Sequence, residues 1–306
     1  MTTLFATDMI TFYQPAFWGL DTTDELNAFA SSKPDAFWDK VMAALSEAGV
    51  SGIELTFGPG SIDNVLKAFG SAKAFGSTLE ARGLTVVSAF MADAPAWSEN
   101  ADLPAIIADA ERRAAFLAEA GGEILVTGLP MRRTVGVRPP LFIDVAFMSH
   151  AAGIAHAIGE AVAAEGIKLA VHTESNSALW YERDIDLFMA FTDPRYVGLC
   201  PDSCHITLGG GDPVRTARRY NQRIILAHWK DAVGEITENL VIDDTIFTQQ
   251  QRFMVDFGAG VVDWNGWSEA MLATPGCETV LLELDAAPDP VAALRAGRAV
   301  VERARS

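Results

Sequence analysis

Residues 199–212 read LCPDSCHITLGGGD, and this stretch carries the pattern that decides the fold. It begins as a buried apolar strand, which breaks at Pro201. Asp202 and His205 follow the break, three residues apart, and three consecutive glycines then let the chain turn away. The order of apolar run, polar residue and helix-like segment recurs along the sequence, so we followed it in both directions.

Eight short apolar runs rich in branched residues are candidate strands. Near-continuous runs of this length are typical of parallel strands that are buried on both faces. They cover residues 3–12, 51–57, 84–92, 123–129, 167–174, 196–202, 223–231 and 278–285.

Helix-like segments separate the runs. Those at 32–49, 103–122 and 147–166 end at glycine, and the last, at 289–306, has a proline in its first turn. Strand followed by helix, eight times over, predicts one (β/α)₈ TIM barrel domain over residues 1–306. A doubly wound open sheet is the alternative, but no G-x-G-x-x-G turn follows the first strand.

Composition narrows the function class. The net charge is −17, with 40 acidic and 23 basic residues, which disfavours nucleic acid and membrane surfaces as partners. Three cysteines without paired spacing make a disulfide framework unexpected. With no signal peptide or apolar span recognisable, we expect a cytoplasmic protein that acts on a small molecule.

Two connections are longer than a barrel needs, at about 13–34 and 231–263. Both follow the carboxyl end of a strand, the face that carries the chemistry in this architecture. They are rich in aromatic residues, including Trp18 in the stretch FYQPAFWG. Ordinary loop packing explains such residues, and so does an aromatic platform for a ring-shaped substrate, for which Trp18 is a candidate.

The last four predicted strands each end in a residue that can bind a metal ion. Because neighbouring parallel strands end at the same barrel edge, these side chains are expected to converge. Buried carboxylates without a cation would repel one another, and one divalent ion relieves that repulsion. Carboxylates with one imidazole favour Mn²⁺, with Mg²⁺, Co²⁺ or Zn²⁺ as alternatives. The four predicted ligands are Glu174, Asp202, His228 and Glu283.

Other polar residues are expected nearby. His205 can donate a hydrogen bond to a substrate oxygen, and Lys230 can reach a substrate hydroxyl. His172 lies two residues before Glu174, on the same side of its strand, and is expected one layer deeper. Glu54 ends the second strand and is either an extra substrate contact or part of a salt bridge.

The sequence resembles the xylose isomerase-like barrel superfamily, the sugar phosphate isomerase/epimerase group. The likeness covers most of the chain and is nearest to the inosose dehydratase branch, through the DSCH turn, the GGGDP stretch and HWKD at 228–231. It implies the same four metal ligands and a substrate-binding role for His205. The chain departs from the family in its aromatic first loop, in a longer loop after HWKD and in a missing arginine, which leaves the substrate open.

We therefore expect a metal-dependent isomerase or epimerase for a sugar or polyol. Glu174 and Glu283 would exchange a proton next to a carbonyl through an enediolate, with the metal ion as Lewis acid. The alternative is a lyase, either a keto-inositol dehydratase or an enzyme that cleaves 3-keto-C-glycosides with a small partner subunit. A sugar-binding protein without turnover is the non-enzyme alternative, and family members suggest a homo-oligomer.

Overall fold

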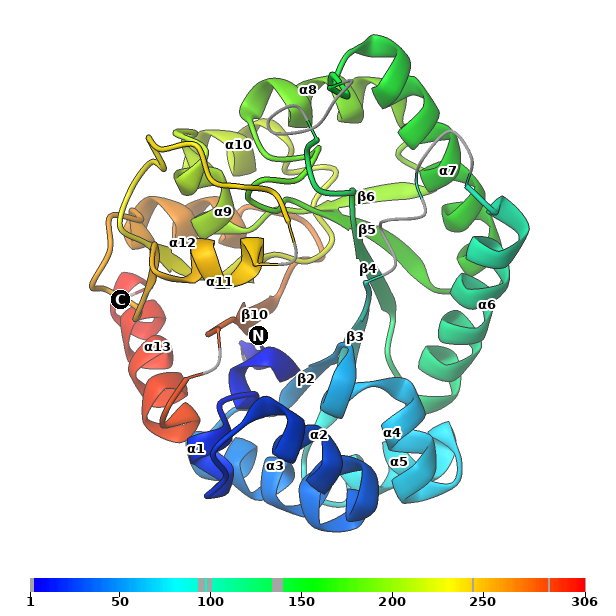
Figure 1. Ribbon diagram of the computed structural model, residues 1–306, viewed down its shortest axis with the longest axis vertical. Coiled ribbons are helices and arrows are strands. Elements are labelled where there is room, and N and C mark those ends of the chain that lie inside the picture. The colour runs from blue at the N-terminus through cyan, green and yellow to red at the C-terminus, as the bar shows by residue number, and fades with distance from the viewer. Residues whose placement is uncertain are drawn as a thin grey trace.

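The computed structural model describes residues 3–92, 97, 101–133, 140–243, 245–285 and 287–305. Eight parallel strands form a ring inside a layer of helices, which confirms the predicted (β/α)₈ barrel (Figure 1). The barrel strands are β1 (Leu4–Asp8), β2 (Gly52–Leu55), β3 (Thr85–Met91), β4 (Ile124–Gly128), β5 (Lys168–His172), β6 (Val197–Cys200), β7 (His228–Trp229) and β10 (Thr279–Leu282).

Hydrogen bonds order these strands as β6-β5-β4-β3-β2-β1-β10-β7. Two isolated parallel bridges, Leu199 with Ile224 and Asp202 with His228, join β6 to the seventh strand and complete the ring. The seventh run is predicted over 223–231, yet only His228 and Trp229 form a regular strand. The seventh strand pairs with β6 only sparsely, mainly at the two bridges.

The barrel helices follow the predicted segments closely. Gly49 ends α3 with φ of 70°, and Gly121 ends α6 with φ of 90°, the left-handed conformation that glycine adopts without strain. The helices are α1 (Pro15–Trp18), α2 (Thr23–Ser32), α3 (Pro34–Ala48), α4 (Ile62–Phe69), α5 (Ala72–Glu80), α6 (Leu103–Ala120), α7 (Val145–Ala163), α8 (Glu182–Phe191), α9 (Ser203–Leu208), α10 (Pro213–Arg219), α11 (Ile246–Gln251), α12 (Trp264–Leu272) and α13 (Pro290–Ala304).

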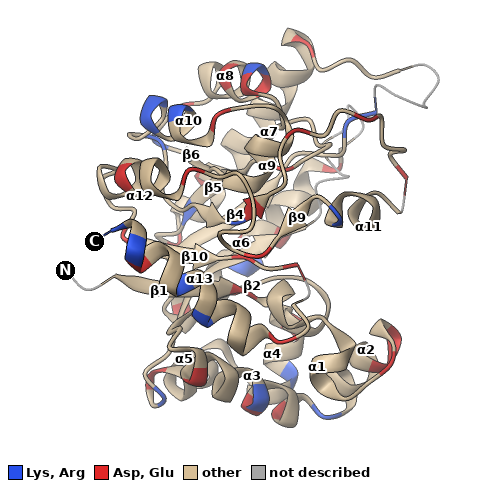
Figure 2. Cartoon of the chain, turned by 90° about the vertical axis from the view of Figure 1, so that its left-hand side faces the viewer, with Lys and Arg blue, Asp and Glu red and all other residues tan. Residues whose placement is uncertain are grey.

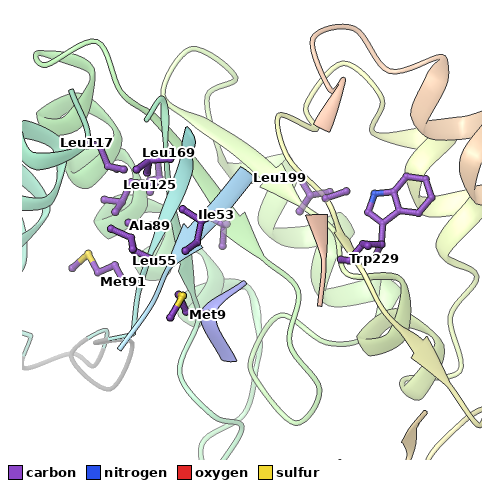
Figure 3. Close-up of a cluster of buried hydrophobic side chains, with 14 of the residues drawn as sticks. Met9, Ile53, Leu55, Ala89, Met91, Leu117, Leu125, Leu169, Leu199 and Trp229 are labelled. Atoms are coloured by element: carbon purple, nitrogen blue, oxygen red, sulfur yellow. The ribbon is translucent and has the colours of Figure 1, made fainter. Parts of the chain in front are cut away.

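The core has two layers because side chains of a strand alternate between its faces. The larger layer packs outward-facing strand residues against the helices, as Figure 3 shows for Ile53, Leu125 and Leu169 with Leu117 of α6. A smaller cluster, with Val126 and Cys200 among its members, joins the other face of several strands. Two residues beyond four members of this cluster, on the same strand face, stand polar residues: Ala6 precedes Asp8, Ala170 precedes His172, Leu226 precedes His228 and Leu281 precedes Glu283.

The two long connections are partly structured. Residues 13–34 contain α1 and α2, whereas residues 231–263 contain α11 and an antiparallel pair, β8 (Asp231–Ala232) with β9 (Met254–Val255). Asp231 is buried and organises this second connection. Its carboxylate accepts hydrogen bonds from the backbone N–H groups of Gly258, Gly260 and Val262 and from the indole N–H of Trp264.

The surface is dominated by mixed charge. In the view of Figure 2, basic residues lie among acidic ones on several helices, including α3 and α13, and do not gather into one basic face. Within the described ranges, no helix combines the length and apolar character that crossing a bilayer would require.

Candidate metal centre at the barrel mouth

Three of the four predicted ligands meet at the carboxyl ends of the strands. Asp202, His228 and Glu283 gather with His172, and one ligand atom from each lies within 4.8 Å of the others. All four residues are buried. His172, predicted one layer deeper, is therefore a full member of the cluster.

Asp202 owes its position to the start of a short helix. It is the N-cap of α9, and its Oδ1 accepts a hydrogen bond of 2.8 Å from the backbone N–H of His205. Its own N–H donates to Thr173 Oγ1. Its other carboxylate oxygen, Oδ2, faces His172 Nε2 at 3.8 Å and has no hydrogen-bond partner. One oxygen thus serves the helix, and the other is available to a ligand.

His228 lies between two carboxylates. Its Nδ1 is 2.6 Å from Glu283 Oε2, and its Nε2 is 3.1 Å from Glu54 Oε1 without the alignment of a hydrogen bond. Glu54 is fully buried, and its Oε2 accepts a hydrogen bond of 2.6 Å from Ser88 Oγ. The strand register brings Glu54 opposite Ser88 and also opposite Asp8. Glu54 therefore contacts a predicted ligand through the barrel interior.

Glu174 belongs to a second group, with His172 and His205. Its Oε2 lies 3.7 Å from His172 Nδ1, and its Oε1 lies 3.4 Å from His205 Nε2. Burial, partly offset by Lys230, raises the pKa of Glu174 to about 8. The two groups share His172, so Glu174 adjoins the cluster from the side of His205.

His205 faces the same space from α9. Its Nδ1 is 2.9 Å from Ser175 Oγ, which fixes the ring beside Glu174. Burial lowers the pKa of His205 to about 3, so the ring is neutral near pH 7. One nitrogen of a neutral imidazole donates and the other accepts. This ring is therefore a neutral polar group and not a resident positive charge, and its contact with a substrate oxygen stays a prediction.

Lys230 is the fixed cation of the centre. Its Nζ lies 2.8 Å from Glu283 Oε1 and 2.9 Å from Asp285 Oδ2, and the side chain is almost fully buried. Burial opposes its charge, but Asp285 and Glu283 outweigh this and raise the pKa of Lys230. The same ion pair also affects the pKa of Glu283. Although burial opposes ionisation, Lys230 and His228 hold the pKa of Glu283 well below its usual range.

The hydrogen bonding of the cluster is incomplete, which is the test of whether a cation fits. Buried polar atoms normally find a partner, so a group of orphans indicates an absent ion or water. The orphans here are potential metal-binding atoms that lie together: both ring nitrogens of His172, Asp202 Oδ2, His228 Nε2 and Glu54 Oε1. Imidazole and carboxylate donors suit Mn²⁺, Co²⁺ or Zn²⁺, so the residues fit a divalent cation.

The sequence and the fold are similar to those of known proteins. A family model described as xylose isomerase-like TIM barrel matches residues 42–304. The chain belongs to the xylose isomerase-like TIM barrel family. Among curated relatives, the inosose dehydratase of Bacillus licheniformis is 28% identical over 153 residues, which are 49% of this chain and 50% of the relative. The chain thus spans about half the length of this relative, and about a third or less of the next ones.

Solved structures agree on the fold. An L-ribulose 3-epimerase gives a TM-score of 0.69 at 15% identity, covering 100% of this chain and 96% of that one. The IolI protein with a bound zinc atom gives 0.66 at 12% identity, covering 99% and 96%. At such identities the likeness concerns the barrel alone. Within this xylose isomerase-like barrel, the polar cluster lies at the strand ends, where barrels of this type carry their chemistry.

Trp18 lies in a different environment from the cluster. Its ring stacks on Phe37 at 4.7 Å between centroids and packs beside Phe29, and its indole N–H donates to the carbonyl of Phe12. The contacts described for Trp18 are therefore those of loop packing, with its one polar atom satisfied by the backbone. Its proposed contact with a substrate stays a prediction.

Sequence reasoning missed three residues of the site. Asp285 is the last residue of the predicted run 278–285, so the strand-end rule pointed to it as well as to Glu283, whereas Asp8 lies inside the predicted run 3–12 and ends a strand only in the structure. Gln250 carries no such signal. It lies on α11 in the second long connection, and its side chain contacts Glu174 directly. Only the tertiary structure brings it there.

Proposed function

We propose that this protein is a divalent-metal-dependent isomerase or epimerase that moves a proton next to the carbonyl of a sugar or polyol. The observation that carries the proposal is the cluster of buried carboxylates and imidazoles with orphaned atoms at the barrel mouth. Membership of a family with sugar-modifying enzymes supports it.

Five residues are available to hold the ion, with Mn²⁺ our first choice: Asp202, His228, Glu283, Glu174 and His172. Such an ion supplies Lewis acidity, which polarises a carbonyl oxygen and makes the neighbouring carbon more acidic. The bound zinc atom of the structurally similar IolI protein favours a metal ion in this chain too, and the identity of the metal here is part of the proposal.

Glu174 is the carboxyl group we assign to take the proton from carbon. It has one oxygen toward His172 and the other toward Gln250 and His205, so it lies beside the cluster without a fixed cation of its own. Glu283 differs, because Lys230 and His228 both pair with it. Once Glu283 carries a proton, its return to the opposite face of the same carbon gives epimerisation, whereas return of the first proton by Glu174 to the adjacent carbon gives isomerisation.

Dehydration of a keto-inositol is the second candidate. The curated relatives named inosose dehydratase favour it. The first step is again proton removal by Glu174, and loss of a β-hydroxyl group then needs an acid. Lys230 is the protonated group of the centre, and His205 is the neutral donor beside Glu174, so these two residues are the candidates for protonating the departing oxygen.

Proton exchange in D₂O tests both candidates. The Mn²⁺-loaded protein is incubated with ketoses, keto-inositols and 3-keto-glycosides, and deuterium uptake and products are followed by NMR and mass spectrometry. We expect metal-dependent exchange that Glu174→Gln abolishes, with the product deciding between isomer, epimer and dehydrated sugar. If the folded protein binds Mn²⁺ but exchanges no proton with any of these substrates, the proposal of an enzyme is rejected in favour of a sugar-binding protein.

A further inference from the structure

We propose that Gln250 is a positioning residue for Glu174, supplied by the long connection between β7 and β10. The role rests on the proposed function, because Glu174 is the proton-carrying group there. It assigns the 231–263 connection a part in catalysis: α11 delivers one amide group that fixes the carboxylate.

The side-chain amide of Gln250 contacts three consecutive residues. Its Nε2 donates to Glu174 Oε1 at 3.0 Å, while its Oε1 accepts from Ser175 Oγ at 2.8 Å and from Asn176 Nδ2 at 2.9 Å. The Nδ2 group of Asn176 can only donate hydrogen bonds, so the amide oxygen of Gln250 faces Asn176 and Ser175 and the amide nitrogen faces Glu174. The orientation of the amide is thus set by all three partners.

Burial makes these bonds consequential. Gln250 is 2% exposed, although it lies on a six-residue helix whose neighbours Phe247 and Thr248 are exposed. A buried amide left without partners is unfavourable, so the side chain is committed to this arrangement. A glutamine that served only solubility would point outward, as its helix neighbours do.

The turn that Gln250 contacts is itself unusual. Asn176 has φ of 63°, the only positive φ at a non-glycine residue in the described part of the chain. Asparagine tolerates this left-handed conformation better than most residues, yet it still needs support from its surroundings. Gln250 provides a bond to Asn176 and another to the carboxylate two residues earlier, so one side chain holds both ends of the segment that presents Glu174.

Helix α11 also touches the far side of the site. Gln251, next to Gln250, donates from its Nε2 to the carbonyl of Asp285, beyond the end of β10. Adjacent residues of α11 therefore contact the segments that follow β5 and β10. In Figure 1, α11 lies inside the ring of outer helices and beside the strand ends, in agreement with these contacts.

Two substitutions at Gln250 separate positioning from simple loop support. Gln250→Met keeps the length and loses all three bonds. Gln250→Glu keeps an acceptor for Ser175 and Asn176 but replaces the donor to Glu174 with a carboxylate oxygen. The matched control is Gln249→Met on the same helix, because Gln249 Nε2 bonds only within the connection, to the Val241 carbonyl and Thr245 Oγ1.

The measurements are kcat and KM on the panel substrate with the fastest exchange, and the Mn²⁺ dissociation constant by calorimetry. Losing a residue that orients a metal-site carboxylate costs about 10- to 100-fold in activity or metal affinity. We expect Q250M and Q250E to lower kcat by about that factor, to change KM little and to weaken Mn²⁺ binding. Q249M should stay close to wild type in all three.

Each outcome decides the role. Q250E that matches wild type in kcat and Mn²⁺ affinity would overturn it, because support of Ser175 and Asn176 alone would then suffice. Should Q250M fail to fold, Q250E, which retains the acceptor oxygen, decides the question. If wild-type protein shows no metal-dependent exchange, the proposed function is overturned, and the role of Gln250 with it. If wild type and Q250E are both active, only the role of Gln250 is overturned.

Discussion

Asp202 and His228 are partners in the parallel β-bridge that joins β6 to β7. This bridge completes the ring of strands and sets two predicted ligands side by side. Just beyond the bridge, the Ser203 hydroxyl donates a hydrogen bond to the Lys230 carbonyl. The contacts that close the barrel therefore also bring two predicted ligands of the candidate metal centre together.

Two substitutions of Asp202 should separate its two roles. Asn at an N-cap accepts the same hydrogen bond from His205 N–H, whereas alanine does not. We expect Asp202→Asn to retain most of the stability and Asp202→Ala to lose about 0.5–2 kcal/mol from the cap alone. Urea unfolding of both variants without metal measures the difference. Equal stability of the two would show that the cap contributes nothing.

Glu54 should act on the metal through His228. Its Oε1 lies 3.1 Å from His228 Nε2 and its Oε2 is held by Ser88, and a hydrogen bond between Nε2 and Oε1, which this structure leaves unaligned, would fix the ring with Nδ1 toward Glu283. Carboxylates that orient a ligating histidine contribute about 10- to 100-fold to metal affinity. We expect that loss in Glu54→Gln and a smaller one in Ser88→Ala, by calorimetric titration with Mn²⁺. Unchanged Mn²⁺ affinity in Glu54→Gln would show that Glu54 does not orient His228 for metal binding.

The sequence was sufficient for the barrel because apolar runs and glycine-terminated helices are local signals. The strand-end rule found Asp202, His228 and Glu283 for a related reason: parallel strands place their carboxyl ends at one edge. The same alternation placed His172 on the correct face, but its entry into the cluster depends on side-chain packing. Local spacing does not encode that packing.

Other features depend on contacts between distant segments. Glu174 lies two residues beyond β5, in a turn that is hydrogen-bonded by Gln250, 76 residues later in the chain. Two helices inside the long connections are short, with four residues in α1 and six in α11, so their periodicity is too brief to predict. Short helices of this kind form because tertiary packing supports them.

The stability of the metal-free protein should fall as pH rises from about 6.5 to about 8, because below pH 6.5 the lowered pKa of His205 has the opposite effect. Glu174 keeps its proton to about pH 8 in the folded chain, against an ordinary value of 4.5 when unfolded. In this window the folded state binds more protons, so the free energy of unfolding decreases, by up to about 1.4 kcal/mol per pH unit. Urea unfolding with a chelator measures it. Glu174→Gln should flatten the decrease, and an identical slope in that variant would contradict the assignment.

Removing the Lys230 ammonium should destabilise the protein strongly. Glu283 and Asp285 would be left buried without their cation, and breaking a buried pair in this way costs about 3–5 kcal/mol. We expect this loss in Lys230→Met by urea unfolding. The control is Lys168→Met, whose exposed pair with Glu123 is worth at most about 1 kcal/mol. Similar losses in the two variants would mean that Lys230 is not holding the carboxylates.

Titration of Mn²⁺ into chelator-treated protein at pH 8, with wild type beside Asp202→Asn and Glu283→Gln, tests the metal centre itself. We expect one site per chain in wild type and a large loss of affinity in both variants, which keep their fold. A wild-type protein that binds no divalent ion, or variants that bind it as tightly as wild type, would contradict the claim that the strand ends form a metal centre.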